Sequence, residues 1–352
     1  MHVPDGFINA PVSAVAGVVA AGAVAVSLRG ARRELGGERT APLAGLVAAF
    51  IFAVQMLNFP VAAGTSGHLL GGALAAILVG PYTGVLCIAV VLLMQGVLFA
   101  DGGLTALGVN ITVMGVVTTV VAYALFRGLT RVLPRTRRST TAASFVAALV
   151  SVPAAAAVFT LIYAIGGTTD VPVSKVLTAM VGVHVLIGIG EAVITALTVG
   201  AVLAVRPDLV HGARGLAAPL KLRVAGELVD APAAVPAPAP AAARSTRKVW
   251  ATGLVTALVL AGFVSFYASA SPDGLEKVAA DKGIDQKAQE HRAAGSPLAD
   301  YSVKDIGNAR ISGGLAGVIG VGVTVVVGSG VFWTVRRRRT PDAPLIRTAE
   351  SV

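Results

Sequence analysis

The sequence has little charge, few aromatic residues and a single cysteine. Only 13% of its 352 residues are charged and 5% are aromatic, whereas 55% are hydrophobic. Charged residues make up about 25% of an ordinary soluble domain, so this composition excludes a soluble globular protein. Cys87 alone provides neither a disulfide framework nor a cysteine-based metal site.

The hydrophobic residues fall into blocks close to the ~20 residues that a helix needs to cross a bilayer. We therefore predict an all-α integral membrane protein, with a seven-span helical bundle and a C-terminal two-span hairpin around an external loop. The predicted spans are residues 8–28, 42–59, 68–80, 82–99, 105–126, 142–165, 179–205, 249–269 and 313–335. The segment 68–80 is short for a full crossing, so we expect it to be tilted, half-buried or re-entrant.

These spans divide the chain into four parts. Residues 1–206 form the first membrane domain and residues 248–335 form the two-span hairpin. The linker 207–247 contains a run of almost pure proline and alanine at 231–243, a composition typical of extended polyproline II structure. Residues 336–352 form a basic tail.

The basic residues predict the orientation. Of the 28 Lys and Arg, 21 fall on one side of the predicted spans and seven on the other, six of these in the loop 270–312. The positive-inside rule places the Arg-rich side in the cytoplasm and the N-terminus outside. The net charge of +10 is thus a topology signal, and lipid rather than nucleic acid is the expected partner. Residues 1–6 lack the basic region of a signal peptide, so the first span is expected to be retained.

A metal site is predicted at the N-terminus. The Met1 amine, the His2 amide nitrogen and the His2 imidazole can form a fused chelate, and His68 on the same outer side can supply a fourth nitrogen. Planar nitrogen ligation suits Ni(II) or Cu(II), and axial ligands adapt such a site to cobalt. The alternatives are an ordinary polar end residue for His2 and a helix-capping histidine for His68.

Polar side chains at or near membrane depth are the next candidates, because burying them is costly. His184 and Glu191 are seven residues apart and therefore share one face of a helix. Hydrogen bonding between helices is their expected role, and positioning of a metal-binding imidazole is the alternative. The residues in this group are Asn58, Ser66, Gln95, Asn110, His184 and Glu191.

The sequence contains no phosphate-binding loop of the form G-x-x-x-x-G-K-[ST]. We therefore expect ATP hydrolysis on other subunits. No catalytic residue and no cofactor are predicted for this chain.

Several blocks resemble the CbiM/NikM family, the substrate-binding membrane component of cobalt and nickel energy-coupling factor ABC transporters. The similar blocks are Met1-His2-Val3-Pro4-Asp5-Gly6-Phe7, Gln55 to Val61, Thr65 to Gly72, Ala100 to Gly108 and His184 to Glu191. A later segment, Ser271 to Ala279 together with Ser296 to Tyr301, resembles the PDGLE-type (CbiN/NikN-like) auxiliary component.

The resemblance implies that Met1, His2 and His68 bind a transported Co2+ or Ni2+. It also implies a transmembrane coupling (T) protein and a pair of cytosolic ATPases as partners, a bacterial plasma membrane location and a link to cobalamin synthesis. Which of the two metals is carried stays open.

Two rival functions are considered. Gly64-Thr65-Ser66-Gly67 together with His184 is similar to the Ser-His dyad of a rhomboid-like intramembrane protease. That interpretation leaves Met1 and His2 unexplained. A stand-alone secondary transporter usually needs several embedded acids, and Glu191 is the one predicted here.

Overall fold

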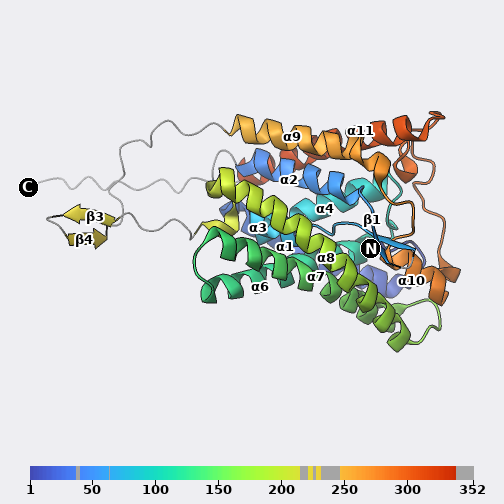
Figure 1. Ribbon diagram of the computed structural model, residues 1–352. Coiled ribbons are helices and arrows are strands. Elements are labelled where there is room, and N and C mark those ends of the chain that lie inside the picture. The colour runs from blue at the N-terminus through green and yellow to red at the C-terminus, as the bar shows by residue number, and fades with distance from the viewer. Residues whose placement is uncertain (37–39, 63, 215–220, 225–226, 231–245, 338–352) are drawn as a thin grey trace, which may run out of the picture.

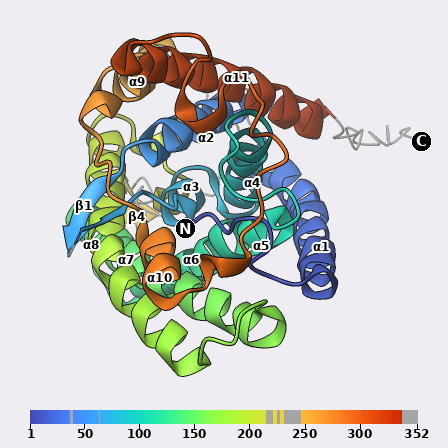
Figure 2. The ribbon, with the colours of Figure 1, turned by 90° about the vertical axis from the view of Figure 1, so that its right-hand side faces the viewer.

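The protein is a bundle of helices whose long axes lie roughly along one line, seen from the side in Figure 1 and from one end in Figure 2. The computed structural model describes residues 1–36, 40–62, 64–214, 221–224, 227–230 and 246–337. The α-helices are α1 (Ala10–Glu34), α2 (Thr40–Gln55), α3 (Gly72–Val79), α4 (Pro81–Leu98), α5 (Leu107–Asn110), α6 (Thr118–Val132), α7 (Arg137–Gly166), α8 (Val173–Val205), α9 (Arg247–Gly262), α10 (Gly274–Lys282) and α11 (Ala309–Arg337). The strands are β1 (Phe59–Ala62), β2 (Thr65–Gly67), β3 (Lys221–Val224) and β4 (Glu227–Asp230). A π-helical segment η1 (Ile111–Val117) joins α5 to α6, and short 3-10 helices are η2 (Pro207–Leu209), η3 (His211–Ala213), η4 (Val264–Tyr267), η5 (Asp285–Lys287) and η6 (Ala299–Tyr301).

Within the described part of the chain, seven helical segments are long and apolar enough to cross a membrane. They are α1, α4, the continuous segment Leu107–Val132, α7, α8, the segment Arg247–Tyr267 and α11. The prediction of an all-α membrane protein that ends in a two-helix hairpin is confirmed.

Two of the nine predicted spans are shorter than a full crossing. The helix α2 has 16 residues, and α3 has eight, all of them buried. At 1.5 Å per residue α3 is about 12 Å long, less than half of the ~30 Å hydrocarbon core. Gly71 and Gly80, with φ of 87° and 103°, flank it at both ends. The predicted span 68–80 is therefore a short helix inside the bundle, as its length had indicated.

The C-terminal hairpin packs against the first membrane domain. The helix α11 lies along α2, and α9 contacts both. A side chain at Gly320 would overlap the ring of Phe52, and one at Gly45 would overlap Ser329. Because these glycines allow the backbones to approach closely, the hairpin is attached by close packing of α11 against α2.

The linker 207–247 contains more structure than its composition predicts. The helices η2 and η3 follow α8 directly, and β3 pairs with β4 in an antiparallel hairpin. The Pro-Ala run 231–243 and the tail beyond residue 337 lie outside the described residues, so their extended and cytoplasmic character stays a prediction.

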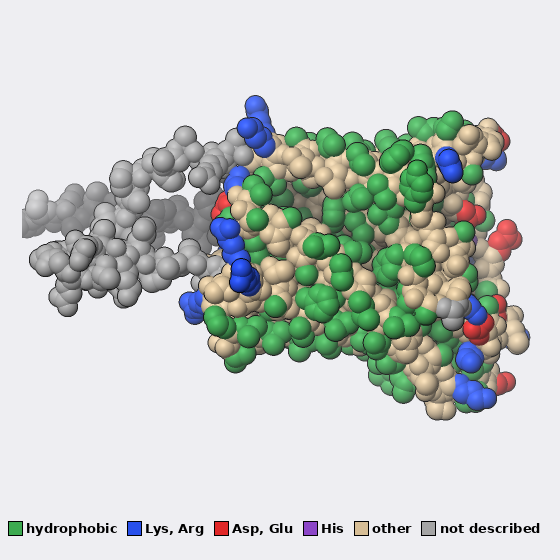
Figure 3. Space-filling view, in the orientation of Figure 1, with side chains coloured by type: hydrophobic (Ala, Val, Ile, Leu, Met, Phe, Trp, Pro, Cys, Tyr) green, Lys and Arg blue, Asp and Glu red, His purple; other side chains and the backbone are tan. Residues whose placement is uncertain are grey.

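Charged side chains gather at the two ends of the bundle, with a hydrophobic band between them (Figure 3). Lys and Arg dominate the end at which α6 meets α7, whereas the opposite end carries both basic and acidic residues. The N-terminus and α10 lie at this second end (Figure 1). A bilayer would enclose the band between the ends.

Candidate metal site

The first residues of the chain lie inside the end of the bundle, with Met1 2% and Val3 0% exposed. Asn110 pairs with both backbone groups of Val3: its Oδ1 accepts the Val3 N–H at 2.8 Å and its Nδ2 donates to the Val3 oxygen at 3.1 Å. The carboxylate of Asp5 accepts the Thr105 backbone N–H at 2.7 Å. These contacts hold the N-terminus at the centre of the bundle end (Figure 2).

His68 is positioned by the short hairpin of β1 and β2, and it directly follows β2. Gly64, in the turn between the strands, has φ of 72°, a left-handed conformation that glycine adopts readily. The His68 Nδ1 lies 3.0 Å from the Leu69 carbonyl oxygen, so Nδ1 donates to this oxygen and Nε2 is turned toward the Met1 amine.

Glu191 fixes the chain just after His68. Its two carboxylate oxygens, from α8, accept the backbone N–H groups of Leu70 at 2.5 Å and Gly71 at 2.9 Å. The buried acid thus joins α8 to the segment that leads into α3.

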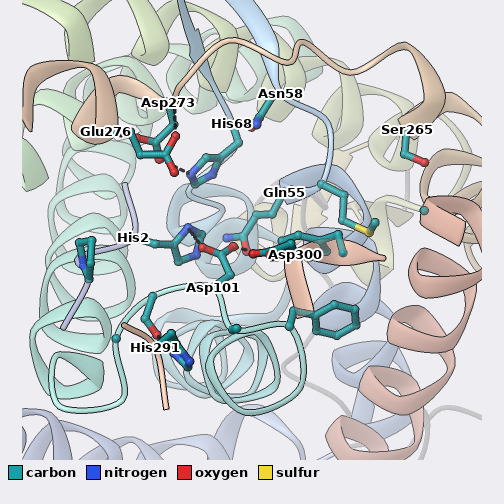
Figure 4. Close-up of a pocket in the computed structure, with 18 of the residues that line it drawn as sticks. His2, Gln55, Asn58, His68, Asp101, Ser265, Asp273, Glu276, His291 and Asp300 are labelled. Carbon is teal, nitrogen blue, oxygen red and sulfur yellow. Dashed lines mark hydrogen bonds and ion pairs between the residues drawn. The ribbon is translucent and has the colours of Figure 1, made fainter. Parts of the chain in front are cut away.

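Three potential ligands meet at this point. The Met1 amine lies 2.6 Å from His68 Nε2, and the rings of His2 and His68 stack with centroids 5.0 Å apart. Asp273, immediately before α10, joins them: its Oδ2 lies 2.8 Å from the Met1 amine and 3.4 Å from His68 Nε2. His2, His68 and Asp273 each offer a ligand atom within 4.8 Å of the others, and all three are buried. Figure 4 shows these side chains converging from separate elements.

His2 has two further partners. Its Nε2 lies 3.2 Å from Gln95 Oε1, and its Nδ1 lies 3.2 Å from Asp101 Oδ1. Asp101 is held in turn by Tyr301, whose hydroxyl donates to Oδ2 at 2.6 Å. Burial, partly offset by Asp101, lowers the pKa of His2 to about 4, so the imidazole is uncharged at neutral pH and can bind a metal.

Asp273 is a buried carboxylate that forms an ion pair with the Met1 ammonium. Burial by itself raises its pKa, but the Met1 ammonium and His68 outweigh that effect and hold the pKa well below its usual range. The carboxylate is therefore ionised at neutral pH.

A cavity of about 600 Å3 opens beside this cluster. It is lined by His2, Asp101, Asp273, Glu276 and Asp300 among others, so its wall offers several carboxylates. The lining also contains Arg310, but acidic side chains outnumber it, which favours cations near the histidines.

Most of the other predicted residues surround the cluster. Gln95, Asn110 and Glu191 hold His2, Val3 and the chain after His68, as described above. The Ser66 hydroxyl donates to the Ser271 carbonyl oxygen at 2.7 Å. At Asn58 the contact is made by the backbone, whose carbonyl oxygen accepts the Ser269 N–H at 2.7 Å.

His184 lies beside Gly274, the residue that follows Asp273, and its hydrogen bond stays within its own helix. Its Nδ1 lies 2.7 Å from the Met180 carbonyl oxygen of its own helix, so the ring is tied to α8. Because the Ser66 hydroxyl donates to the segment before α10, the contacts of these two residues do not form a Ser-His dyad.

Sequence reasoning missed the acids Asp5, Asp101 and Asp273 and the phenol of Tyr301. One local signal was present: Asp273 and Glu276 have the spacing of a capping box, and the structure forms it at the start of α10. That signal predicts a helix, but it does not predict the helix's contact with Met1.

Family comparisons identify both parts of the chain. Residues 2–209 match the model of the cobalt uptake substrate-specific transmembrane region, and residues 247–337 match the PDGLE domain. The first match covers more than half of the chain, and the two matches lie on either side of the linker.

Individual relatives agree with these matches. A protein of Haloquadratum walsbyi named "putative metal transport protein" is 40% identical over 210 residues, which are 60% of this chain and 93% of that protein. The fused nickel transport protein NikMN of Rhodobacter capsulatus is 42% identical over 126 residues, 36% of each chain. A crystal structure of a transition metal transporter is similar with a TM-score of 0.50 and 27% identity, over 58% of this chain and 93% of that chain.

Proposed function

The chain belongs to the family of substrate-specific transmembrane proteins of cobalt uptake, and from this premise we propose that it captures Co2+ or Ni2+ at the outer face of a bacterial plasma membrane. The captured ion is then released inward when the bundle reorients. The chain itself acts as a transport component and performs no chemical conversion.

The observation that carries this proposal is the contact between the Met1 amine and His68 Nε2 at 2.6 Å. This contact is a hydrogen bond of the protonated amine, and an ion that replaces the proton would find the two nitrogens close to the spacing of neighbouring ligands. Metal–nitrogen distances of about 2.0–2.1 Å at right angles place such ligands about 2.9 Å apart. His2 follows Met1 directly and its ring stacks on His68. Its ring nitrogens face Gln95 and Asp101 in this structure, so the imidazole has to turn toward the amine to complete the chelate.

The donor set accounts for the choice of metals. Amine, amide and imidazole nitrogens in one plane favour nickel, and further ligands above or below that plane adapt the site to cobalt. Nitrogen donors hold transition metals better than they hold Mg2+ or Ca2+, which prefer oxygen. The His2 amide would bind after releasing its proton to solvent.

Energy for release must come from other chains, because the sequence has no phosphate-binding loop. We assign this role to a transmembrane coupling protein and a pair of cytosolic ATPases, as in energy-coupling factor transporters. In a cell that makes cobalamin, the imported cobalt would supply that synthesis.

The proposal is tested by lengthening the chain ahead of Met1 by four residues. This moves the amine away from His2 and His68, so uptake of radiolabelled Co2+ and Ni2+ should fall at least tenfold in cells that also express the coupling protein and the ATPases. His68→Ala should give a similar loss.

A matched control carries the same four residues inside the Pro-Ala run 231–243, where uptake should stay unchanged. Immunoblots of membranes verify equal amounts of protein, and N-terminal sequencing verifies the first residue. Undiminished uptake of both metals by the variant extended at Met1 would rule out the proposed chelate.

A further inference from the structure

The second domain reaches into the proposed metal site through one side chain. Asp273 belongs to the loop between α9 and α11, yet it contacts the first residue of the chain: its Oδ2 lies 2.8 Å from the Met1 amine. The same oxygen lies 3.4 Å from His68 Nε2, as Figure 4 shows for these two side chains.

The two oxygens of Asp273 have separate roles. Oδ1 accepts the backbone N–H groups of Leu275 at 2.8 Å and Glu276 at 2.9 Å, which caps the N-terminus of α10. Oδ2 faces the amine and His68 instead. The cap holds the carboxylate in place while it leaves one oxygen directed at the site.

The loop that carries Asp273 is fixed on the first domain by close contacts. The Ser66 backbone N–H donates to the Pro272 carbonyl oxygen at 2.9 Å, one residue before Asp273. A side chain at Gly274 would lie 2.7 Å from Ile187 and 3.2 Å from the His184 ring, so only glycine lets α10 approach α8 this closely. Asp273 is therefore held against His68 by both of its neighbours in sequence.

The three donor atoms form a triangle suited to one ion. Its edges are 2.6 Å between the amine and His68 Nε2, 2.8 Å between the amine and Oδ2, and 3.4 Å between Nε2 and Oδ2. Adjacent ligands of an ion with bonds of about 2.0–2.1 Å are about 2.9 Å apart. The two short edges are contacts of the protonated Met1 amine with His68 Nε2 and Asp273 Oδ2. An ion that displaces the ammonium proton and binds the two nitrogens would have Oδ2 as its third neighbour.

We propose that Asp273 of the PDGLE domain is a ligand of the transported ion, so that the metal site is shared by the two domains. This inference builds on the proposed function. The carboxylate adds an oxygen to the nitrogen ligands of Met1, His2 and His68, and such an additional ligand suits six-coordinate Co2+ better than planar Ni2+. It also brings a negative charge to a buried divalent ion whose other named side-chain ligands are neutral imidazoles.

The test compares the full-length purified protein with its Asp273→Asn variant in detergent. Asparagine retains the capping oxygen, so α10 should stay formed, while the anionic ligand is lost. We expect the Kd for Co2+ to rise at least tenfold and the Kd for Ni2+ to rise less, in competition titrations with a chromophoric chelator. The absorption spectrum of bound Co2+, which reports its coordination number, should change as well.

Asp281→Asn, an exposed acid on the same helix, is the matched control and should keep both affinities. Asp273→Ser, which also caps a helix but lacks a carboxylate, replaces Asp273→Asn if that variant fails to fold. Unchanged affinities and an unchanged Co2+ spectrum in the Asp273 variant would overturn the inference.

His68→Ala distinguishes failure of the proposed metal site from failure of Asp273 as a ligand. If His68→Ala abolishes binding while Asp273→Asn binds like wild type, the metal site stands and Asp273 is not a ligand. If wild type and His68→Ala bind neither metal, the proposed function fails and this inference fails with it.

Discussion

At the scale of single residues, the proposed metal site includes side chains that position its ligands without being ligands themselves. Glu191 illustrates this, because its two oxygens satisfy the N–H groups of Leu70 and Gly71 directly after His68. Residues that orient metal ligands typically account for 10–100-fold in affinity.

Glu191→Gln should therefore weaken binding of Ni2+ by at least tenfold. A glutamine offers one acceptor oxygen and one amino group, so one buried backbone N–H loses its partner, at a cost of roughly 1–3 kcal/mol in stability. Titration of purified protein measures the affinity, and thermal unfolding measures the stability. Thr178→Ala, on the exposed face of α8, is the control and should leave both unchanged. Wild-type affinity in Glu191→Gln would show that the segment after His68 keeps its position without this acid.

Ser66 provides a second prediction, which separates transport from proteolysis. Ser66→Ala removes the hydroxyl contacts with the Ser271 and Pro272 carbonyl oxygens but keeps the backbone contact with Pro272. Loss of such hydrogen bonds costs about 0.5–1.5 kcal/mol each, so metal uptake should fall only a few-fold. Ser174→Ala, an exposed serine at the start of α8, should have no effect. Complete loss of function in Ser66→Ala, as expected of a protease nucleophile, would contradict the transport role.

At the scale of elements, hydropathy locates the apolar helices, and their length then indicates which of them can cross a bilayer. The spans that became α7, α8 and α11 were predicted because each exceeds the length of a bilayer crossing. The helix α3 is too short to meet this length criterion. Glycines with positive φ flank its eight residues, all of which are buried inside the bundle.

The residues of the candidate site also differ in whether the sequence alone could indicate them. Met1 and His2 could be selected from the sequence because a chelate at a chain end is a local pattern, and His68 because the predicted topology places it on the same side of the membrane. Asp273 could not, since its contact with Met1 joins residues 272 positions apart and depends on how α10 docks against α8. No local spacing encodes that docking.

Attachment of the hairpin depends on glycines in α11, which makes it testable. Gly320→Leu should force α11 away from α2, because any side chain there overlaps Phe52. With a protease site placed in the run 231–243, the wild-type halves should co-purify after cleavage, whereas the Gly320→Leu halves should separate and bind Co2+ at least tenfold more weakly. Gly322→Leu is the matched control, since nothing lies within 4 Å of a side chain at that glycine. Equal co-purification of the two variants would show that the contact between α11 and α2 is dispensable.

At the scale of the whole molecule, four distant segments converge at one end of the bundle. The N-terminus, the β1–β2 hairpin, the turn after α4 and the loop before α10 all contribute to the cluster around His68 (Figure 2). Gathering these segments at one end leaves the apolar band in Figure 3 for the lipid. The orientation of this end relative to the cell decides whether the site can capture metal from outside.

That orientation rests on the 21 basic residues on one side of the spans against seven on the other, and a labelling experiment tests it. Cys87 is the only cysteine, and it is buried, so Cys87→Ala provides a background without thiols. In that background, Lys304→Cys, near the metal-site end, should react with a membrane-impermeant maleimide in intact cells. Arg131→Cys, also exposed but at the Arg-rich end, should react only after the membrane is opened. The reverse pattern would place Met1 in the cytoplasm, where the site could not capture an external ion, and both the positive-inside assignment and the proposed direction of transport would fail together.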